Sequence, residues 1–226
     1  MRSDLPKPLV PVAGRPIVRH LLDSLEGAGL RAITVVIGHG AEAMKAELGD
    51  TCTTAFQAVR SGTAHAVEVA LDTVRESQYV YVMVGDSPLL RASSIEKLFE
   101  EHVSRNAACS FLTASFAEHF PYARVVRDEQ GSVTACIEER DATESQKEIK
   151  EYLTSHFLFT TKYLLEQIQL IEPHPKTQER YLTDMIPLLL KAGHRVEAID
   201  MGDWRELVGL NTPEDVEWAE EVLTDD

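Results

Sequence analysis

Cysteine is scarce in this chain of 226 residues, and the three that occur, Cys52, Cys109 and Cys136, are far apart. Their odd number and wide spacing fit neither a disulfide framework nor a metal site, which would need closely spaced ligands. We therefore expect buried free thiols in a protein that works in a reducing compartment.

Long hydrophobic runs are also missing. No apolar stretch approaches the roughly 20 residues needed to cross a bilayer, and the start MRSDLPKPLV lacks the apolar core of a signal peptide. The content of 44% hydrophobic and 26% charged residues is typical of a globular protein with a substantial core. These features predict a cytoplasmic protein in which residues 1–226 form one large domain, with a domain and a half as the alternative.

Basic residues are few relative to acidic ones. The chain has 22 Lys and Arg against 37 Asp and Glu, a formal net charge of -15. Nucleic acids and anionic membranes are bound through clustered Lys and Arg, so we expect neither as a partner. An acidic protein that binds an anionic substrate must recruit a divalent cation and a few well-placed basic groups. A homo-oligomer is compatible with this composition.

The most informative stretch is YVYVMVGDSPLL, residues 79–90. Its apolar run predicts a central strand of a covered, mostly parallel sheet, in which ligands bind beyond the carboxyl ends of the strands. Asp86 follows that strand and offers a hard oxygen ligand suited to Mg²⁺, while Gly85 would allow a turn and a close approach. An ordinary Gly-Asp turn is the alternative.

Strands and helices alternate along the chain, which indicates an α/β fold with a mostly parallel, mixed sheet flanked by helices. Two short apolar runs around the turn sequence DEQG predict a β-hairpin over residues 123–138, in a small antiparallel part. Further strands are expected at 32–37, 53–56, 108–114, 152–160 and 195–200, and helices at 17–27, 93–103, 162–171, 180–192 and 214–223.

Two Gly-containing turns could be functional. His39, between Gly38 and Gly40, could act as a base or be only a turn residue. Gly62-Thr63 precede a helix, where unpaired backbone N–H groups favour anions or the polar edge of a ligand. Capping of that helix by Thr63 is the alternative.

The last helix has a complete start signal. Thr212 is a natural N-cap, Pro213 takes the first helical position and Asp215 completes a capping box. Because Thr212 does the capping, Asn211 has no structural task in the sequence and is a candidate ligand.

Several motifs together resemble the nucleotidyltransferase domain of bacterial N-acetylglucosamine-1-phosphate uridylyltransferase, a sugar-nucleotide pyrophosphorylase. They are SDLPKPLVPVAGRPI, VVIGHG, QAVRSGTAHA, VGDSPLL, IEERDAT, YLTD and VGLN, in the same order from residue 1 to about residue 215. The resemblance implies a Rossmann-like nucleotidyltransferase fold with a nucleotide-binding half at residues 1–115. Residues 116–226 would supply the sugar-binding part and the C-terminal helix.

The reaction implied by the resemblance is attack of a sugar 1-phosphate on the α-phosphorus of UTP or another NTP, with release of pyrophosphate. By similarity, Asp86 and Asn211 would hold Mg²⁺ and Lys7 would contact the phosphates; alone, Lys7 reads as a surface lysine. The positions similar to uracil-binding residues are Gln57, Gly62 and Thr63. The positions similar to sugar-binding residues are Ala123, Glu138, Leu153, Tyr181 and Thr183, and for Tyr181 simple packing is the alternative.

The chain departs from the family pattern in the sugar pocket. The family's Y-G-R is Tyr122-Ala123-Arg124 here, and its N-T-G is Leu153-Thr154-Ser155. Loss of a hydrogen-bonding partner in a polar pocket changes discrimination strongly. We therefore expect nucleotidyl transfer to be kept, with N-acetylglucosamine 1-phosphate or a related sugar 1-phosphate as the acceptor.

The two ends also differ. The family's first strand ends in a Gly-rich loop, L-A-A-G-x-G-T-R-M, and Met1 aligns with its final Met. The C-terminal β-helix with acetyltransferase activity has no counterpart here, so neither acetyl transfer nor a β-helix trimer is expected. The missing Gly-rich loop, together with Leu153, supports an alternative function, a non-catalytic or truncated sugar-nucleotide-binding protein on the same fold. A dinucleotide-dependent oxidoreductase has little support, because no strand is followed by G-x-G-x-x-G.

Overall fold

The computed structural model describes residues 5–116 and 119–225, in two compact units. Unit 1 consists of Met1–Val59, Val84–Glu96 and Arg205–Asp226, and unit 2 of Arg60–Met83 and Lys97–Trp204. Met1, aligned above with the end of a Gly-rich loop, lies outside the described residues. In the ranges that are described, no helix is both long and apolar enough to cross a membrane.

Unit 1 is built around α1 (Ile17–Gly27), whose apolar residues recur at helical spacing and are buried. The chain before α1 contains a short antiparallel hairpin of β1 (Pro11–Val12) and β2 (Arg15–Pro16). After α1, β3 (Thr34–Ile37) pairs in parallel with β4 (Thr53–Phe56) through the crossover helix α2 (Ala41–Leu48).

The C-terminal helix α9 (Pro213–Asp225) belongs to unit 1 and begins where the sequence predicts. Its apolar face packs in a small core that is shared with the start of the chain. The members of this core are Val10, Val12, Ile17, Leu89, Leu210, Val216, Trp218, Ala219, Val222 and Leu223. The two ends of the unit are thereby fixed to one another.

Unit 2 contains a six-stranded mixed sheet with the order β10-β6-β9-β7-β8, and β5 pairs with β9 as well. The strands are β5 (Tyr79–Val82), β6 (Cys109–Ser115), β7 (Ala123–Arg127), β8 (Val133–Ile137), β9 (Glu151–Thr160) and β10 (Val196–Asp200). Its helices are α3 (Thr63–Glu68), α4 (Leu71–Val74), the later part of α5 (Ala92–Ser104), α6 (Glu144–Lys147), α7 (Thr161–Gln167) and α8 (Met185–Lys191). The predicted hairpin over residues 123–138 is β7 and β8, and it is antiparallel.

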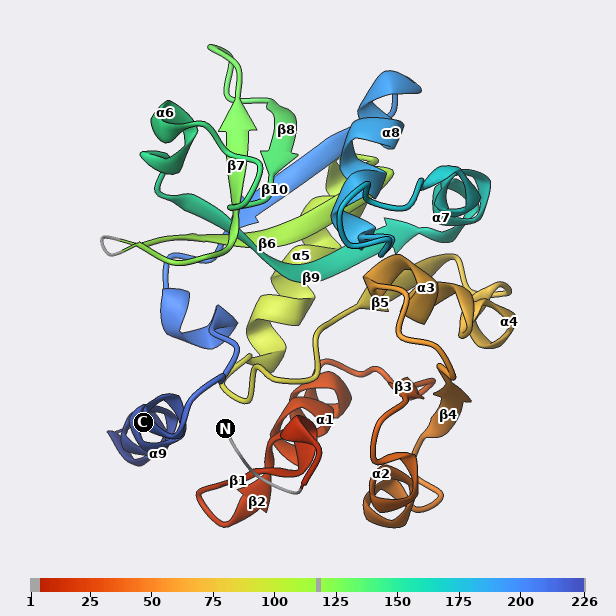
Figure 1. The fold of residues 1–226 in the computed structure, drawn as a ribbon, viewed down its shortest axis with the longest axis vertical. Helices are drawn as coiled ribbons and strands as arrows, with labels where there is room; N and C mark the ends of the chain where they lie inside the picture. The colour runs from red at the N-terminus through yellow and green to blue at the C-terminus, as the bar shows by residue number, and fades with distance from the viewer. Residues whose placement is uncertain (1–4, 117–118, 226) are drawn as a thin grey trace. The chain divides into compact units, whose positions relative to one another are not determined.

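Alternation along the central strands places apolar residues on both faces of this sheet. Phe111, Phe157 and Phe159 belong to the main core with residues of α7 and α8. On the other face, His102 of α5 bonds to Ser110 and Thr160. The strands are therefore covered on both sides, as an α/β fold requires (Figure 1).

The α/β class and the mixed sheet flanked by helices are confirmed, but the prediction for β5 is wrong in one respect. Tyr79–Val82 pairs antiparallel with Phe157–Thr160, and within the described residues it has no parallel neighbour. Among the strands of the described residues, only β10–β6 and β3–β4 pair in parallel. An apolar run predicts a strand but not its partner, and the ten-residue strand β9 pairs with both β5 and β7.

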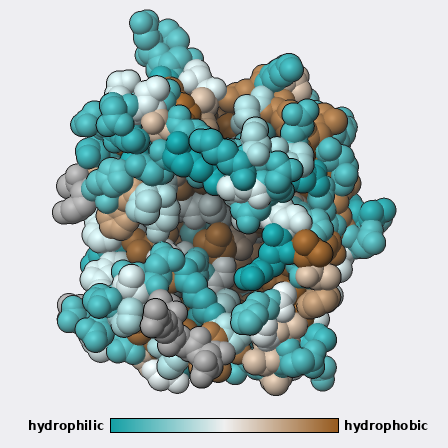
Figure 2. All heavy atoms as spheres, in the orientation of Figure 1, coloured by the Kyte–Doolittle hydropathy of each residue, from teal (hydrophilic) through white to brown (hydrophobic). Residues whose placement is uncertain are grey.

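The compact units also divide the chain differently from the predicted halves, residues 1–115 and 116–226. Because β5 and β6 pair with β9, the chain from Arg60 to Met83 and from Lys97 onward groups with the later residues. The predicted helix over 180–192 starts later, as the 3-10 turn Leu182–Asp184 followed by α8. The face drawn in Figure 2 is mainly hydrophilic, as expected from the charged composition.

Candidate functional site

Three of the predicted site residues meet in unit 1. The Lys7 ammonium donates to Asp86 Oδ2 in a short ion pair and to Asn211 Oδ1 at 2.8 Å. The three residues come from the first turn of the chain, the loop after β5 and the loop before α9. Two oxygen atoms from distant parts of the sequence thus converge on one cation.

Gly209 explains how the Asp86 carboxylate reaches this position. A Cβ atom at residue 209 would lie 3.0 to 3.1 Å from the three carboxyl atoms of Asp86, so any side chain there would crowd it. The Leu210 N–H also donates to the Asp86 carbonyl oxygen at 3.0 Å. Gly85, by contrast, has neither a left-handed φ nor a close neighbour, since a Cβ there would lie 3.9 Å from Pro8. The glycine that another part of the protein approaches closely is therefore Gly209. The prediction that Gly85 has this role is wrong as far as neighbours in the protein are concerned.

Asn211 has structural partners that the sequence did not suggest. Its Nδ2 donates to the Gly209 carbonyl at 2.9 Å, which turns Oδ1 toward Lys7. Asp215 accepts from the N–H groups of Asn211 at 2.6 Å and Thr212 at 2.8 Å, and its own N–H donates to Thr212 Oγ1 at 3.1 Å. The predicted capping box is present, and Asp215 additionally fixes the backbone of Asn211.

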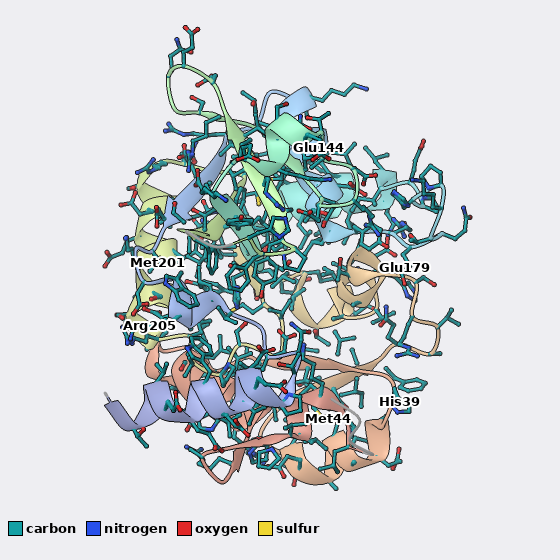
Figure 3. All side chains as sticks on the ribbon, turned by 60° about the vertical axis from the view of Figure 1, so that its left-hand side comes forward. His39, Met44, Glu144, Glu179, Met201 and Arg205 are labelled. Atoms are coloured by element: carbon teal, nitrogen blue, oxygen red, sulfur yellow. The ribbon has the colours of Figure 1, made fainter. Side chains whose placement is uncertain are left out.

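The Gly38-His39-Gly40 turn holds the segment that carries Lys7. Gly40 has φ +69°, and a Cβ there would lie 2.1 Å from Pro6 Cγ. Lys7 follows Pro6 in the 3-10 turn Lys7–Leu9, which is closed by a Val10 N–H bond to the Lys7 carbonyl. His39 itself is exposed on the turn (Figure 3). The turn therefore packs against Pro6 through Gly40, and this contact does not involve the His39 side chain.

The donor set suits a hard divalent cation. Asp86 supplies a carboxylate that is 25% exposed and Asn211 an amide oxygen, and the Lys7 ammonium already lies between them as a stand-in cation. Among the described residues, no group of three or more His, Cys, Asp or Glu could hold a metal ion. A carboxylate oxygen and an amide oxygen are hard ligands of the kind that Mg²⁺ prefers.

The predicted nucleotide-binding residues lie at two places. Gln57 follows β4 in unit 1, and its N–H donates to the Ile37 carbonyl at 2.8 Å. Gly62 and Thr63 lie in unit 2, where Gly62 has φ +100° and a Cβ would meet Arg180 O at 2.2 Å. Thr63 does not cap α3, because Gly62 is the N-cap and the Thr63 hydroxyl accepts from Leu182 N at 2.9 Å.

Three of the predicted sugar-binding residues lie close together in unit 2. Thr183 Oγ1 donates to Glu138 Oε1 at 2.9 Å. The Tyr181 hydroxyl donates to Glu179 at 2.6 Å and accepts from Arg140 at 3.0 Å, and the Arg140 guanidinium lies 4.2 Å from the centre of the Tyr181 ring. Tyr181 is therefore held by polar contacts as well as by packing; Glu179 is labelled in Figure 3.

Asp184 and Arg140 join this group and were not singled out from the sequence. Burial, together with the neighbouring Glu138 carboxylate, raises the pKa of Asp184 above its ordinary value. Arg140 lies in the motif IEERDAT and Asp184 in YLTD, and these motifs also contain predicted sugar-binding residues. Their closeness in sequence to those residues was the only feature that could have pointed to Arg140 and Asp184.

Ala123 and Leu153 are core residues. They are Cα partners across the β7–β9 pair and are 3% and 2% exposed. The neighbouring Arg124 is fully buried, forms an ion pair with Glu139 and stacks 4.7 Å from the Tyr152 ring centre. The two departures from the family pattern thus lie next to each other, with apolar side chains on the inside of unit 2.

Unit 1 also contains a cavity of about 410 Å³ beside α1, α9 and residues 88–92. Its lining includes Arg91, Arg205 and Glu206, and Arg205 is labelled in Figure 3. Glu206 is 5% exposed and accepts from the backbone N–H of Arg91, at the start of α5, and from the hydroxyl of Ser94. None of the predicted site residues lines this cavity.

Comparison with known proteins agrees with the motifs. Residues 1–174 match the family model of the MobA-like NTP transferase domain. The chain is similar to the bifunctional protein GlmU of Heliobacterium modesticaldum, at 39% identity over 226 residues, which is 100% of this chain and 49% of that protein. It is also similar to GlmU of Enterococcus faecalis, at 38% over 212 residues, 93% of this chain and 46% of that protein.

A third relative is the bifunctional protein GlmU of Carboxydothermus hydrogenoformans, at 38% identity over 211 residues, covering 93% of this chain and 47% of that protein. The chain thus spans about half the length of the curated relatives it matches. The resemblance drawn from the sequence motifs is confirmed, and by the match over most of its length the chain belongs to the MobA-like NTP transferase domain family.

Proposed function

We propose that this protein is a Mg²⁺-dependent nucleotidyltransferase that transfers UMP from UTP, or the corresponding group from another NTP, to a sugar 1-phosphate. The acceptor is N-acetylglucosamine 1-phosphate or a related sugar 1-phosphate, and pyrophosphate is released. The single observation that carries the proposal is the convergence of Lys7, Asp86 and Asn211 in a member of an NTP transferase family.

The reaction needs positioning and charge neutralisation more than acid–base chemistry. An oxygen of the sugar phosphate forms a bond to the α-phosphorus of the NTP. The bond between the α-phosphorus and the oxygen that links it to the β-phosphate breaks at the same time, and pyrophosphate leaves with that electron pair. The second pKa of a phosphate monoester is about 6, so the attacking oxygen is already ionised near neutral pH and no protein base is required. Preorganised cationic groups then stabilise the charge that develops on the phosphates.

The residues divide between these tasks. Asp86 and Asn211 would hold Mg²⁺, which when bound neutralises phosphate charge, and Lys7 would contact the phosphates. Gln57, Gly62 and Thr63 would bind the base. Glu138, Tyr181 and Thr183 would bind the sugar, with Ala123 and Leu153 forming part of the wall behind it. Substrates of this kind are consistent with a cytoplasmic enzyme.

The test is release of pyrophosphate from each of the common NTPs across a panel of sugar 1-phosphates, with and without Mg²⁺. Asp86→Asn should reduce turnover at least about 100-fold, because it removes a metal ligand and almost no volume. Asp50→Asn, the same chemical change at an exposed position of unit 1, is the matched control and should keep wild-type turnover.

Two results would refute the proposal. One is the absence of pyrophosphate release by the wild-type protein with every NTP and sugar 1-phosphate. The other is wild-type turnover in Asp86→Asn. Tight nucleotide or sugar binding without turnover, measured by calorimetry, would instead support a binding protein on the same fold.

A further inference from the structure

The Lys7 ammonium occupies the point at which the two candidate metal ligands converge. It contacts Asp86 Oδ2 and Asn211 Oδ1, the latter at 2.8 Å. These contacts join residues that are 79 and 204 positions apart in the sequence, so they are not a local consequence of chain connectivity.

A divalent ion and an ammonium cannot both use this pair of oxygens. Mg²⁺ binds oxygen at roughly 2.0–2.1 Å and an ammonium at about 2.7–2.9 Å, so sharing the pair would place two cations within a few ångströms of each other. At that separation their repulsion is strong in a partly buried site. Binding of the metal therefore requires the ammonium to leave.

The backbone and side chain of Lys7 differ in their freedom to move. The backbone is held by the 3-10 turn, by the Val10 N–H bond and by the contact of Pro6 with Gly40. The side chain is 33% exposed and has a flexible four-carbon stem, so the ammonium can swing while its backbone stays in place.

We propose that the Lys7 ammonium is an internal counter-ion, which the divalent ion displaces from Asp86 and Asn211 and which then binds the phosphates of the nucleotide. This inference rests on the proposed function and adds to it a coupling between binding of the metal and binding of the nucleotide phosphates. The metal alone loses affinity by evicting an ammonium that has no new anion to bind. The metal together with a phosphate chain avoids that loss, so each favours binding of the other.

The first experiment measures Mn²⁺ binding to the protein without nucleotide, by calorimetry and by electron paramagnetic resonance of free Mn²⁺. Lys7→Met removes the competing cation while keeping the apolar stem. We expect Mn²⁺ to bind roughly two- to fivefold more tightly to this variant than to the wild type, the effect of removing one partly exposed ion pair. Lys45→Met, at a lysine that pairs with Glu42, is the matched control and should bind Mn²⁺ like the wild type.

The second experiment measures binding of inorganic pyrophosphate without metal. Lys7→Met should bind it roughly tenfold more weakly than the wild type, so the substitution moves the affinities for Mn²⁺ and pyrophosphate in opposite directions. A lysine that merely braces Asp86 would produce the opposite sign for Mn²⁺, because a loosened carboxylate binds the metal less well. Asp86→Asn should remove the tighter Mn²⁺ binding of Lys7→Met in the double variant.

Unchanged or weaker Mn²⁺ binding in Lys7→Met would overturn the inference, as would tighter binding that persists after Asp86→Asn. Neither result depends on turnover. Pyrophosphate release by the wild type would leave the proposed function standing if the counter-ion role failed. Tighter Mn²⁺ binding by Lys7→Met, with no nucleotidyl transfer by the wild type, would support the counter-ion role and refute the proposed function.

Discussion

Acidification should destabilise this protein through one buried histidine. His102 is 1% exposed and lies between two hydroxyl groups, with Nδ1 at 2.8 Å from Ser110 Oγ and Nε2 at 3.0 Å from Thr160 Oγ1. The Thr160 hydroxyl donates to the Ala107 carbonyl at 2.8 Å, so it accepts from His102. Because burial lowers the pKa of His102, the ring is neutral near pH 7, with its proton on Nε2 and with Ser110 donating to Nδ1.

The magnitude follows from the cost of charging this ring. Burial lowers the pKa of His102 from 6.5 to about 4. Above pH 6.5 the ring is neutral in both folded and unfolded chains, so it adds no pH dependence. Between pH 6.5 and 4 only the unfolded chain takes up the proton, and the free energy of unfolding falls by about 1.4 kcal/mol per pH unit. The loss reaches about 3 kcal/mol at pH 4 and levels off below it.

The assay is urea unfolding followed by circular dichroism at intervals from pH 7.5 to 4.5, for the wild type and for His102→Gln. Glutamine keeps a donor and an acceptor but does not titrate. Other titrating groups contribute equally to both proteins, so the difference between the two slopes isolates His102. We expect the wild-type slope to be steeper by about 1.4 kcal/mol per pH unit between pH 6 and 4.5. Parallel slopes would show that the folded protein accepts this proton, and the reasoning from burial would be wrong.

Two further substitutions test the geometry of each unit. Gly209→Ala adds a methyl group 3.0 to 3.1 Å from the Asp86 carboxyl atoms at a position without left-handed φ, so the carboxylate must shift. We expect turnover in the pyrophosphate assay to fall about tenfold with little change in melting temperature, and full activity would contradict the crowding argument. Leu153→Asn places an amide in the core of unit 2 at a side chain that is 2% exposed, and should lower the free energy of unfolding by about 3 kcal/mol. We also expect kcat/KM for N-acetylhexosamine 1-phosphates to be higher for Leu153→Asn than for the wild type, when both are assayed below the melting temperature of the variant. An unchanged kcat/KM would mean that the pocket is built for another sugar.

Local signals in the sequence were sufficient for most of the elements. Helix α1 has apolar residues at helical spacing, α9 has a complete capping box, and the DEQG turn joins β7 to β8. These signals involve neighbours in the chain, so they can be read without knowing the fold. The partner of β5 could not be read in this way, because the run that predicts the strand says nothing of which distant strand pairs with it.

The same holds for the candidate site, where single residues could be recognised in the sequence but contacts between distant residues could not. Asp86 and Asn211 were candidate ligands from their places in the sequence and Lys7 only by resemblance, but nothing in the sequence alone indicates that the three side chains touch. Gly209 was part of a quoted motif, yet its role depends on a carboxylate more than a hundred positions earlier. The burial of Ala123 and Leu153 likewise follows from the pairing of β7 with β9, which their local sequences do not reveal.

The position of β9 has a consequence for synthesis of the chain. Strands β5, β6 and β7 all hydrogen-bond to β9, which ends only at Thr160. On the ribosome, the first two of these strands must wait as unpaired apolar segments until β9 has emerged, because contacts so distant in sequence form late. Nascent chains that stop before Thr160 should therefore be the ones that recruit chaperones.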